Sequence, residues 1–186
     1  TCTPYNGTRK KLSYSAAFDI GAQGRAVLGA ETERNDARFA DINTGAPFSG
    51  DVRKNAVFGE LNWALTDRVD LTASLRYDDH SDFGSFTSGR LAAVYRLRDD
   101  LVLRGSLSNN FRAPSLYELY GPYGNPAMQR EESLSADLGI EKTYGDKGRV
   151  RLTAFWLDAE NLIGWDFGAT YCGSGFGCYN QVPGTS

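Results

Sequence analysis

The sequence lacks any long hydrophobic run. In its 186 residues no stretch of about 18 apolar residues occurs, which excludes a transmembrane helix. Low-complexity tracts and linkers are also absent. The chain starts at Thr1 without the basic and apolar regions of a signal peptide, so we expect a mature or truncated start.

A strong excess of charge of one sign is absent as well. The sequence has 20 lysines and arginines against 23 aspartates and glutamates, a formal net charge of −3. The cations are spread along the chain and form no electrostatic footprint for nucleic acid. We therefore expect no nucleic-acid partner.

Histidine is nearly absent, which narrows the possible catalytic chemistry. The single histidine, His80, precedes Ser81 and Asp82, the residue types of a Ser/His/Asp set. Sequence neighbours rarely reach the geometry in which one base contacts both nucleophile and acid, so we expect neither an enzyme nor a cofactor. Asp78, Asp79 and Asp82 offer oxygen ligands for calcium, but no EF-hand pattern surrounds them, and a solvated loop tip is the favoured alternative.

Cysteine is scarce, with three in the chain. Cys172 and Cys178 bracket the short loop GSGFG and are close enough to bridge a hairpin tip, and a disulfide there fits an oxidising compartment. A metal site is the alternative, but neither a CxxC spacing nor a nearby histidine supports it. Cys2 is left over, and a partner upstream of Thr1 would account for it.

The sequence does contain long segments in which polar and apolar residues alternate. Residues 68–78 follow this period of two, which predicts a β-strand. Residues 12–20 and 134–140 do the same, and five further segments repeat the pattern with more noise: 25–36, 55–66, 88–98, 100–110 and 148–158. Each is about ten residues long, which a tilted strand needs to cross a bilayer, whereas soluble strands run about five or six. The residues predicted to face lipid include Val69, Leu71, Leu75, Leu134, Leu138, Val150, Leu152 and Trp156.

Short and long connections alternate between these segments. The short turns read IGAQG, LTDR, LRDD and YGDKG, and the longer links cover residues 37–50, 79–86, 112–132 and 159–178. Short periplasmic turns and long extracellular loops are typical of outer-membrane barrels. The sequence therefore predicts an all-β fold, an antiparallel meander of long tilted strands that is part of a transmembrane β-barrel. A β-sandwich with a solvated outer face is the alternative.

The polar face of these strands carries many charges. Charge at membrane depth must face water or a partner, so these side chains should point away from lipid. We expect an ion-pair network along the lumen from Arg68, Arg76, Arg90, Arg96, Arg104, Arg149, Arg151, Asp70, Asp137 and Glu141.

The segment FRAPSLYELYGPYGNP, beginning at Phe111, resembles the signature of TonB-dependent outer-membrane receptors of the cobalamin and siderophore branch. The resemblance covers most of the chain, from about Ala56 to the end, and departs from the family pattern at residues 127–130. The signature positions include Phe111, Arg112, Ala113, Pro114, Glu118, Pro126 and Glu131.

The resemblance implies a full-length barrel of 22 strands, occluded by an N-terminal plug and coupled to TonB through an energy-coupling box. Neither plug nor box is visible, so we expect residues 1–186 to be a partial β-barrel domain, with the plug and the remaining strands absent. The implied location is the outer membrane of a Gram-negative bacterium. The implied partners are outer-membrane lipid and, through the missing N-terminal region, the TonB complex.

The implied function is active import of a scarce large nutrient, an iron siderophore or cobalamin, with a passive porin or structural barrel as the alternative. A metal chelate or corrin is a large planar ligand on which aromatic rings stack. The candidate ligand-binding residues are Tyr117, Tyr120, Tyr123, Asn125, Trp165, Phe167 and Tyr171. Packing within the loop is the alternative role for the tyrosines. In the signature itself, Arg112 and Glu118 are candidates for a bidentate pair.

Overall fold

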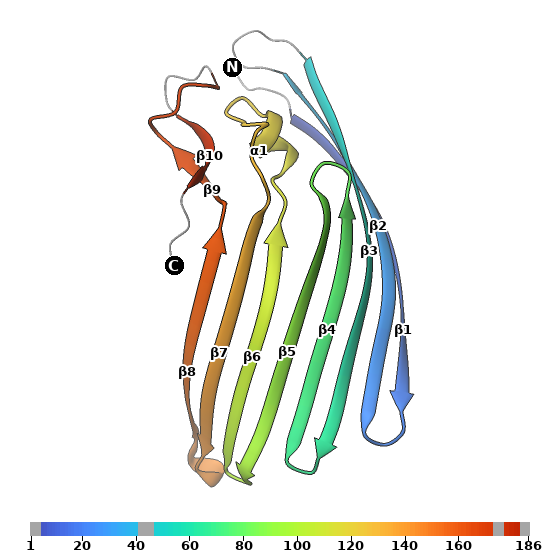
Figure 1. The fold of residues 1–186 in the computed structure, drawn as a ribbon, viewed down its shortest axis with the longest axis vertical. Helices are drawn as coiled ribbons and strands as arrows, with labels where there is room; N and C mark the ends of the chain where they lie inside the picture. Colours follow the sequence, from blue (N-terminus) through green and yellow to red (C-terminus); the bar gives the residue numbers. More distant parts are fainter. Residues whose placement is uncertain (1–4, 41–46, 173–176, 183–186) are drawn as a thin grey trace.

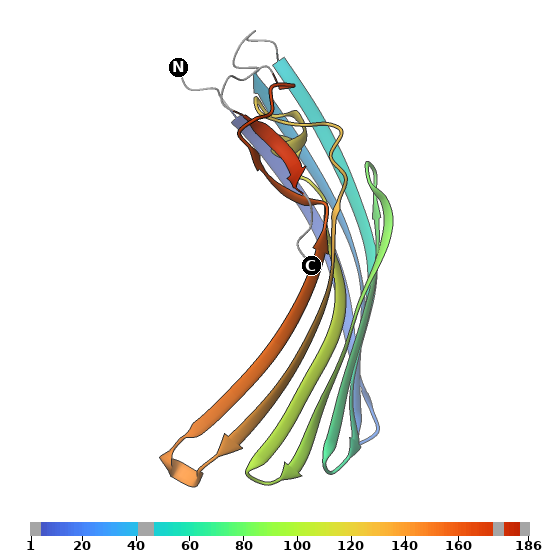
Figure 2. The same ribbon diagram turned by 60° about the vertical axis from the view of Figure 1, so that its left-hand side comes forward.

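The computed structural model describes residues 5–40, 47–172 and 177–182. Its main element is an antiparallel eight-stranded sheet in which each strand pairs with the next along the chain (Figure 1). The strands are β1 (Tyr5–Ile20), β2 (Gly24–Ala40), β3 (Pro47–Thr66), β4 (Val69–His80), β5 (Gly84–Arg98), β6 (Leu101–Arg112), β7 (Glu131–Thr143) and β8 (Arg149–Glu160). The sheet is a single curved wall, and the long connections gather at one end of it (Figure 2).

Three smaller elements lie in the connections. A short helix, α1 (Leu116–Tyr120), follows β6, and a 3₁₀ turn at Gly145–Lys147 joins β7 to β8. Strands β9 (Leu162–Asp166) and β10 (Cys178–Val182) pair as a separate two-stranded sheet at the same end as α1 (Figure 1). Within the described ranges no helix is long and apolar enough to span a membrane.

One face of the large sheet, called the outer face here, is apolar along the middle of every strand. Directly paired residues share a face, and the register continues from Leu71 through Ala93 and Gly105 to Leu138. Large apolar side chains stand exposed on it, with Leu12 and Leu152 each 71% exposed. The residues predicted to face lipid share it: Val69, Leu71, Leu75, Leu134, Leu138, Val150, Leu152 and Trp156. In the described part no second layer covers this face, which excludes the β-sandwich and fits contact with lipid.

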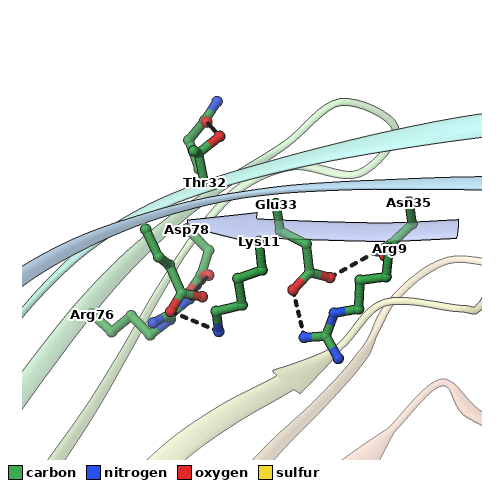
Figure 3. A network of polar contacts seen from close by, with 9 residues as sticks. Arg9, Lys11, Thr32, Glu33, Asn35, Arg76 and Asp78 are labelled. Atoms are coloured by element: carbon green, nitrogen blue, oxygen red, sulfur yellow. Dashed lines mark hydrogen bonds and ion pairs between the residues drawn. The ribbon is translucent and has the colours of Figure 1, made fainter. Parts of the chain in front are cut away.

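The opposite, inner face is polar and carries ion pairs that join distant strands. Near the long-loop end, the Glu31 carboxylate accepts from Lys11 Nζ at 2.9 Å and from Arg76 Nη2 at 2.6 Å, and Arg76 also binds Asp78 at 2.8 Å. Figure 3 shows Lys11, Arg76 and Asp78 on one side of the strands and Thr32 on the other. These ion pairs join β1, β2 and β4 in one network. A charged side chain at membrane depth needs an oppositely charged partner or water, and the network supplies the partners.

A second network lies toward the short-turn end of the inner face. Glu141 is 6% exposed, and its carboxylate oxygens form ion pairs with three guanidinium groups. The nitrogen–oxygen distances are 2.5 Å to Arg151, 3.3 Å to Arg149 and 3.4 Å to Arg104. Arg96 and Asp70 form a further pair between β5 and β4. Seven of the ten residues predicted for the lumen network therefore form ion pairs, whereas Arg68, Arg90 and Asp137 form none within the described part of the chain.

The strands extend further than the sequence pattern indicated. The predicted link at residues 37–50 is largely strand, because β2 continues to Ala40 and β3 begins at Pro47; only residues 41–46 of it lie outside the described residues. Backbone pairing continues past the apolar band, where the outer face becomes polar and the period-two signal is lost. The predicted links at 112–132 and 159–178 likewise contain α1 and β9.

The assignment of faces predicts that a charge destabilises the protein to different extents at two adjacent positions of β4. Leu71→Arg should lower the free energy of unfolding in lipid by about 2 to 4 kcal/mol if this position lies near the bilayer midplane. Thr72→Arg, its matched control on the inner face, should cost about 1 kcal/mol, since it removes the 2.8 Å hydrogen bond from the Thr72 hydroxyl to Asn62. Urea unfolding of the full-length receptor in lipid vesicles checks both values. Equal losses would contradict the assignment.

Candidate functional site

The long connection between β6 and β7 is organised by a helical cap. Ser115 precedes α1, and its hydroxyl accepts from the Glu118 backbone N–H at 3.2 Å. The Glu118 carboxylate accepts in return from the Ser115 N–H at 2.7 Å, which completes a capping box. The sequence signal for this helix is Ser115 followed three residues later by Glu118, a signal that the sequence analysis did not use.

Arg112 holds the two ends of this connection together. Its guanidinium donates from Nε and Nη2 to the two Glu131 oxygens, each at 2.8 Å, and from Nη1 to Glu118 at 3.1 Å. Glu131 also accepts from the Ile163 N–H at 2.6 Å. One planar cation therefore ties the end of β6 to α1, β7 and β9, and the expected pair of Arg112 with Glu118 is present as part of a larger cluster.

The helix packs against the inner face of the sheet. Leu116, 9% exposed, lies with Ala37 of β2 and Val52 of β3 in one buried cluster, and Tyr120 packs against it. An open pocket of about 330 Å³ remains between helix and wall, lined by Arg9, Asn35, Lys54, His80, Ala113 and Ser115, among others. The helix thus covers part of the inner wall at the long-loop end.

A cluster of aromatic residues joins the two long connections. The centroid of the Trp165 ring lies 5.3 Å from the ring centroids of both Tyr123 and Tyr179 and 6.4 Å from that of Phe167. The ring centroids of Tyr117 and Tyr179 are 6.3 Å apart. These five residues are called the aromatic cluster below. The edge-to-face geometries are those that aromatic pairs favour.

Asn125 and Tyr171 border the aromatic cluster. The Asn125 amide donates to the Tyr171 hydroxyl at 3.4 Å, and that hydroxyl donates to the Tyr179 carbonyl. Burial raises the pKa of both Tyr117 and Tyr171, so both phenols are neutral hydrogen-bonding groups near pH 7.

The candidate ligand residues thus separate into two groups. Tyr117, Tyr123, Trp165 and Phe167 lie within the aromatic cluster, and Asn125 and Tyr171 lie beside it. Tyr120 is the exception, because it packs toward the wall with Leu116. Tyr179, which contacts both Trp165 and Tyr117, was missed; its register position opposite Trp165 in the β9–β10 hairpin brings it into the cluster.

A disulfide between Cys172 and Cys178 closes the connection between β9 and β10, with the two Cα atoms 6.0 Å apart. Cys178 is fully buried and pairs with Asp166 in the hairpin register, one position from the pair of Tyr179 with Trp165. Cys2 lies outside the described residues. The disulfide therefore fixes the backbone beside the aromatic cluster.

The residues around His80 do not form a catalytic relay. His80 is 4% exposed, its Nδ1 accepts from the Asp82 backbone N–H at 3.2 Å, and its ring packs on Phe83 at 5.0 Å. The Ser81 hydroxyl donates to Asp82 at 2.7 Å. Asp78 is engaged by Arg76, and among the described residues no cluster of three potential metal ligands occurs.

Removal of Arg112 tests its role as an organiser of the connection. Arg112→Gln leaves the Glu118 and Glu131 carboxylates without their shared cation, so backbone amides of residues 116–125 should exchange about tenfold faster, equivalent to about 1.4 kcal/mol of local stability. Arg112→Lys should recover only part, because an ammonium cannot bind both carboxylates as a planar fork. Hydrogen exchange by mass spectrometry measures both, with Arg96→Gln as a control at the other end of the sheet. Unchanged exchange in Arg112→Gln would refute this role.

The disulfide predicts two measurable properties. Mass spectrometry of the unreduced protein should find Cys172 and Cys178 in one cross-linked peptide, and replacing both by Ser should destabilise the β9–β10 hairpin by about 2 kcal/mol, a modest effect because the closed loop is short. Hydrogen exchange at Tyr179 and Asn180 reports the second effect. Two free thiols in untreated protein would contradict the assignment.

Comparison with known proteins gives a consistent family. Residues 3–186 match the family described as TonB dependent receptor-like, beta-barrel. The chain is 34% identical over 118 residues to an iron-regulated outer membrane virulence protein of Vibrio cholerae, covering 58% of this chain and 18% of that protein. It is 34% identical over 99 residues to the vitamin B12 transporter BtuB of the same species, covering 52% of this chain and 16% of that protein.

The fold matches solved structures over nearly its whole length. The crystal structure of the siderophore receptor PirA from Pseudomonas aeruginosa superposes with a TM-score of 0.77 at 26% identity, covering 97% of this chain and 35% of that one. The chain thus spans about a fifth of the curated relatives and about a third of this solved structure. With a family match across almost every residue, the chain belongs to the β-barrel part of the TonB-dependent receptors, a family of non-enzymatic transporters of the Gram-negative outer membrane.

Proposed function

We propose that the full-length receptor carrying this chain binds and imports a scarce large nutrient, a ferric siderophore or cobalamin, with energy supplied through TonB. The family membership supports active transport, and two of its relatives are named for iron regulation and for vitamin B12. The plug and the energy-coupling box belong, in this proposal, to parts of the receptor beyond residues 1–186. In this proposal the present chain contributes the polar inner face, which lines part of the lumen, and several of the outer loops.

The observation that carries the proposal is the aromatic cluster. Tyr123 and Trp165, which are more than forty positions apart in the sequence, meet at the long-loop end of the wall, the end that faces the external ligand in this proposal. Phe167 is 84% exposed and Tyr171 53% exposed, so part of this aromatic surface is free to stack on a planar ligand. Tyr117 packs on the ring of Tyr179 and Tyr123 on the ring of Trp165, so both belong to the same cluster.

Exposed members of this surface provide the test of ligand binding. Phe167→Ala combined with Tyr171→Ala should weaken the affinity of the full-length receptor for its ligand more than tenfold, about 1.4 kcal/mol, because stacking area is lost while the supporting rings remain. Tyr144→Ala, an exposed tyrosine at the short-turn end, is the matched control and should leave affinity unchanged. Binding isotherms with a panel of ferric siderophores and cobalamin measure the dissociation constants. Unchanged affinity with normal surface expression would move the site to other loops.

Energy coupling separates the proposal from its alternative, a passive porin or structural barrel. Uptake by an active receptor stops when TonB is deleted or the proton gradient is collapsed, while ligand binding persists. Uptake that continues at the same rate without TonB would favour the porin.

A further inference from the structure

The outer face changes its chemistry in steps toward the long-loop end. A rung is used here for a row of directly paired residues on neighbouring strands. The last rung rich in apolar residues contains Tyr14, Ala30, Val57 and Tyr77. Tyr14 is 75% exposed and Tyr77 47% exposed, which suits residues at the boundary between lipid tails and headgroups.

A mixed rung follows, two residues further along each strand. Leu12 pairs with Thr32, Thr32 with Asn55 and Asn55 with Asp79. The Thr32 hydroxyl donates to Asn55 at 2.9 Å on this outer face. Between this rung and the short turns, the paired residues of β1 to β4 include no charged residue on the outer face, so the rung marks the upper edge of the apolar band.

The next rung consists only of cations. Lys10 pairs directly with Arg34, and Arg34 pairs directly with Arg53. These three residues are called the cationic row. Paired strands lie about 5 Å apart, so the row is about 10 Å wide, and it lies about 7 Å beyond the mixed rung. All three residues are exposed.

Within the described residues, Arg34 is the one member of the cationic row that forms ion pairs. Arg34 binds Asp36 and Asp51, each at 3.3 Å, and both acids lie on the following rung, away from the apolar band. Among the described residues, neither Lys10 nor Arg53 has an ion pair; Asp79, the acid of the mixed rung, is paired in register with Asn55. Like charges directly opposite one another destabilise a sheet, and an anion from outside the chain beside Lys10 and Arg53 would relieve this repulsion.

The inner face of the same strands at the same level is different. Arg9 has Glu33 at 2.5 Å, Lys11 has Glu31 at 2.9 Å, and Arg76 has both Glu31 and Asp78 (Figure 3). On that side the wall supplies carboxylates within reach of these cations. A row in which each cation directly faces another cation is therefore found on the outer face, where the neighbouring molecules are lipids.

We propose that the cationic row binds phosphate groups on the headgroups of outer-leaflet lipids. Its place just beyond the apolar band is the level of the headgroups, and basic clusters at this level attract anionic lipids. Arg34 and Arg53 offer planar forks that match a phosphate, and Lys10 adds a flexible point charge at the end of the row. A glycolipid with more than one phosphate would span the row better than a lipid with one.

The test uses the full-length receptor, purified and reconstituted in vesicles. The combined variant Lys10→Gln, Arg34→Gln and Arg53→Gln should retain at least tenfold less phosphorylated lipid A through purification, measured by mass spectrometry per mole of protein. Vesicles with bis-phosphorylated lipid A should raise the thermal unfolding temperature of the unmodified receptor, and fully dephosphorylated lipid A should not. The combined variant should lose this difference.

A matched control removes three cations at the opposite end of the wall. Arg25→Gln, Arg98→Gln and Lys147→Gln change the net charge equally and should leave lipid retention unchanged. Equal loss in the control would mean a general charge effect and would overturn the proposal, as would inorganic phosphate stabilising the receptor as much as the phosphorylated lipid does. If the combined variant fails to assemble, Lys10→Gln and Arg53→Gln alone should each reduce retention about threefold, and unchanged retention in both would equally overturn it. Nutrient affinity is measured separately and does not decide this test.

Discussion

The structure depends on one constraint: every backbone N–H and C=O of a membrane-crossing strand needs a partner on a neighbouring strand, because lipid offers none. Antiparallel pairing meets this need for β2 to β7, which have a neighbour on each side, and its register is irregular only near the short turns, between Ala64 and Thr66 and between Arg96 and Arg98. Pairing of this kind places alternate side chains on opposite faces. The division between an apolar outer face and a polar inner face follows directly.

That division determines where the stabilising contacts are found. A soluble protein of this size buries a hydrophobic core, but here the large apolar side chains of the strands point outward, as Leu12 and Leu152 do. On the inner face the strands are connected by shared carboxylates, with Glu31 bridging Lys11 and Arg76. Buried apolar packing is concentrated near the long-loop end, for example where Leu116 meets Val52.

The long connections pack against the same sheet at its long-loop end. Arg112 binds Glu118 of α1 and Glu131 at the start of β7, and α1 covers the inner face of β2 and β3. The β9–β10 hairpin contacts the same connection where Trp165 packs on Tyr123. A surface for a large ligand can therefore be built without a catalytic group, since stacking and hydrogen bonding at the mouth are sufficient for binding. The outer face of the same strands meets lipid, so one set of strands serves two different environments.

The sequence by itself determined the alternating faces, the antiparallel meander and the family, because a period of two and the segment beginning at Phe111 are local signals. It also indicated which side chains gather at the mouth, yet it grouped Tyr120 with Tyr117 and Tyr123. Only the tertiary structure decided that Tyr120 turns to the wall, that β2 and β3 extend to residues 40 and 47, and that Lys10, Arg34 and Arg53 form one rung. The physical reason is the same in each case: these features depend on register between strands and on packing between residues far apart in the chain, which no local pattern encodes.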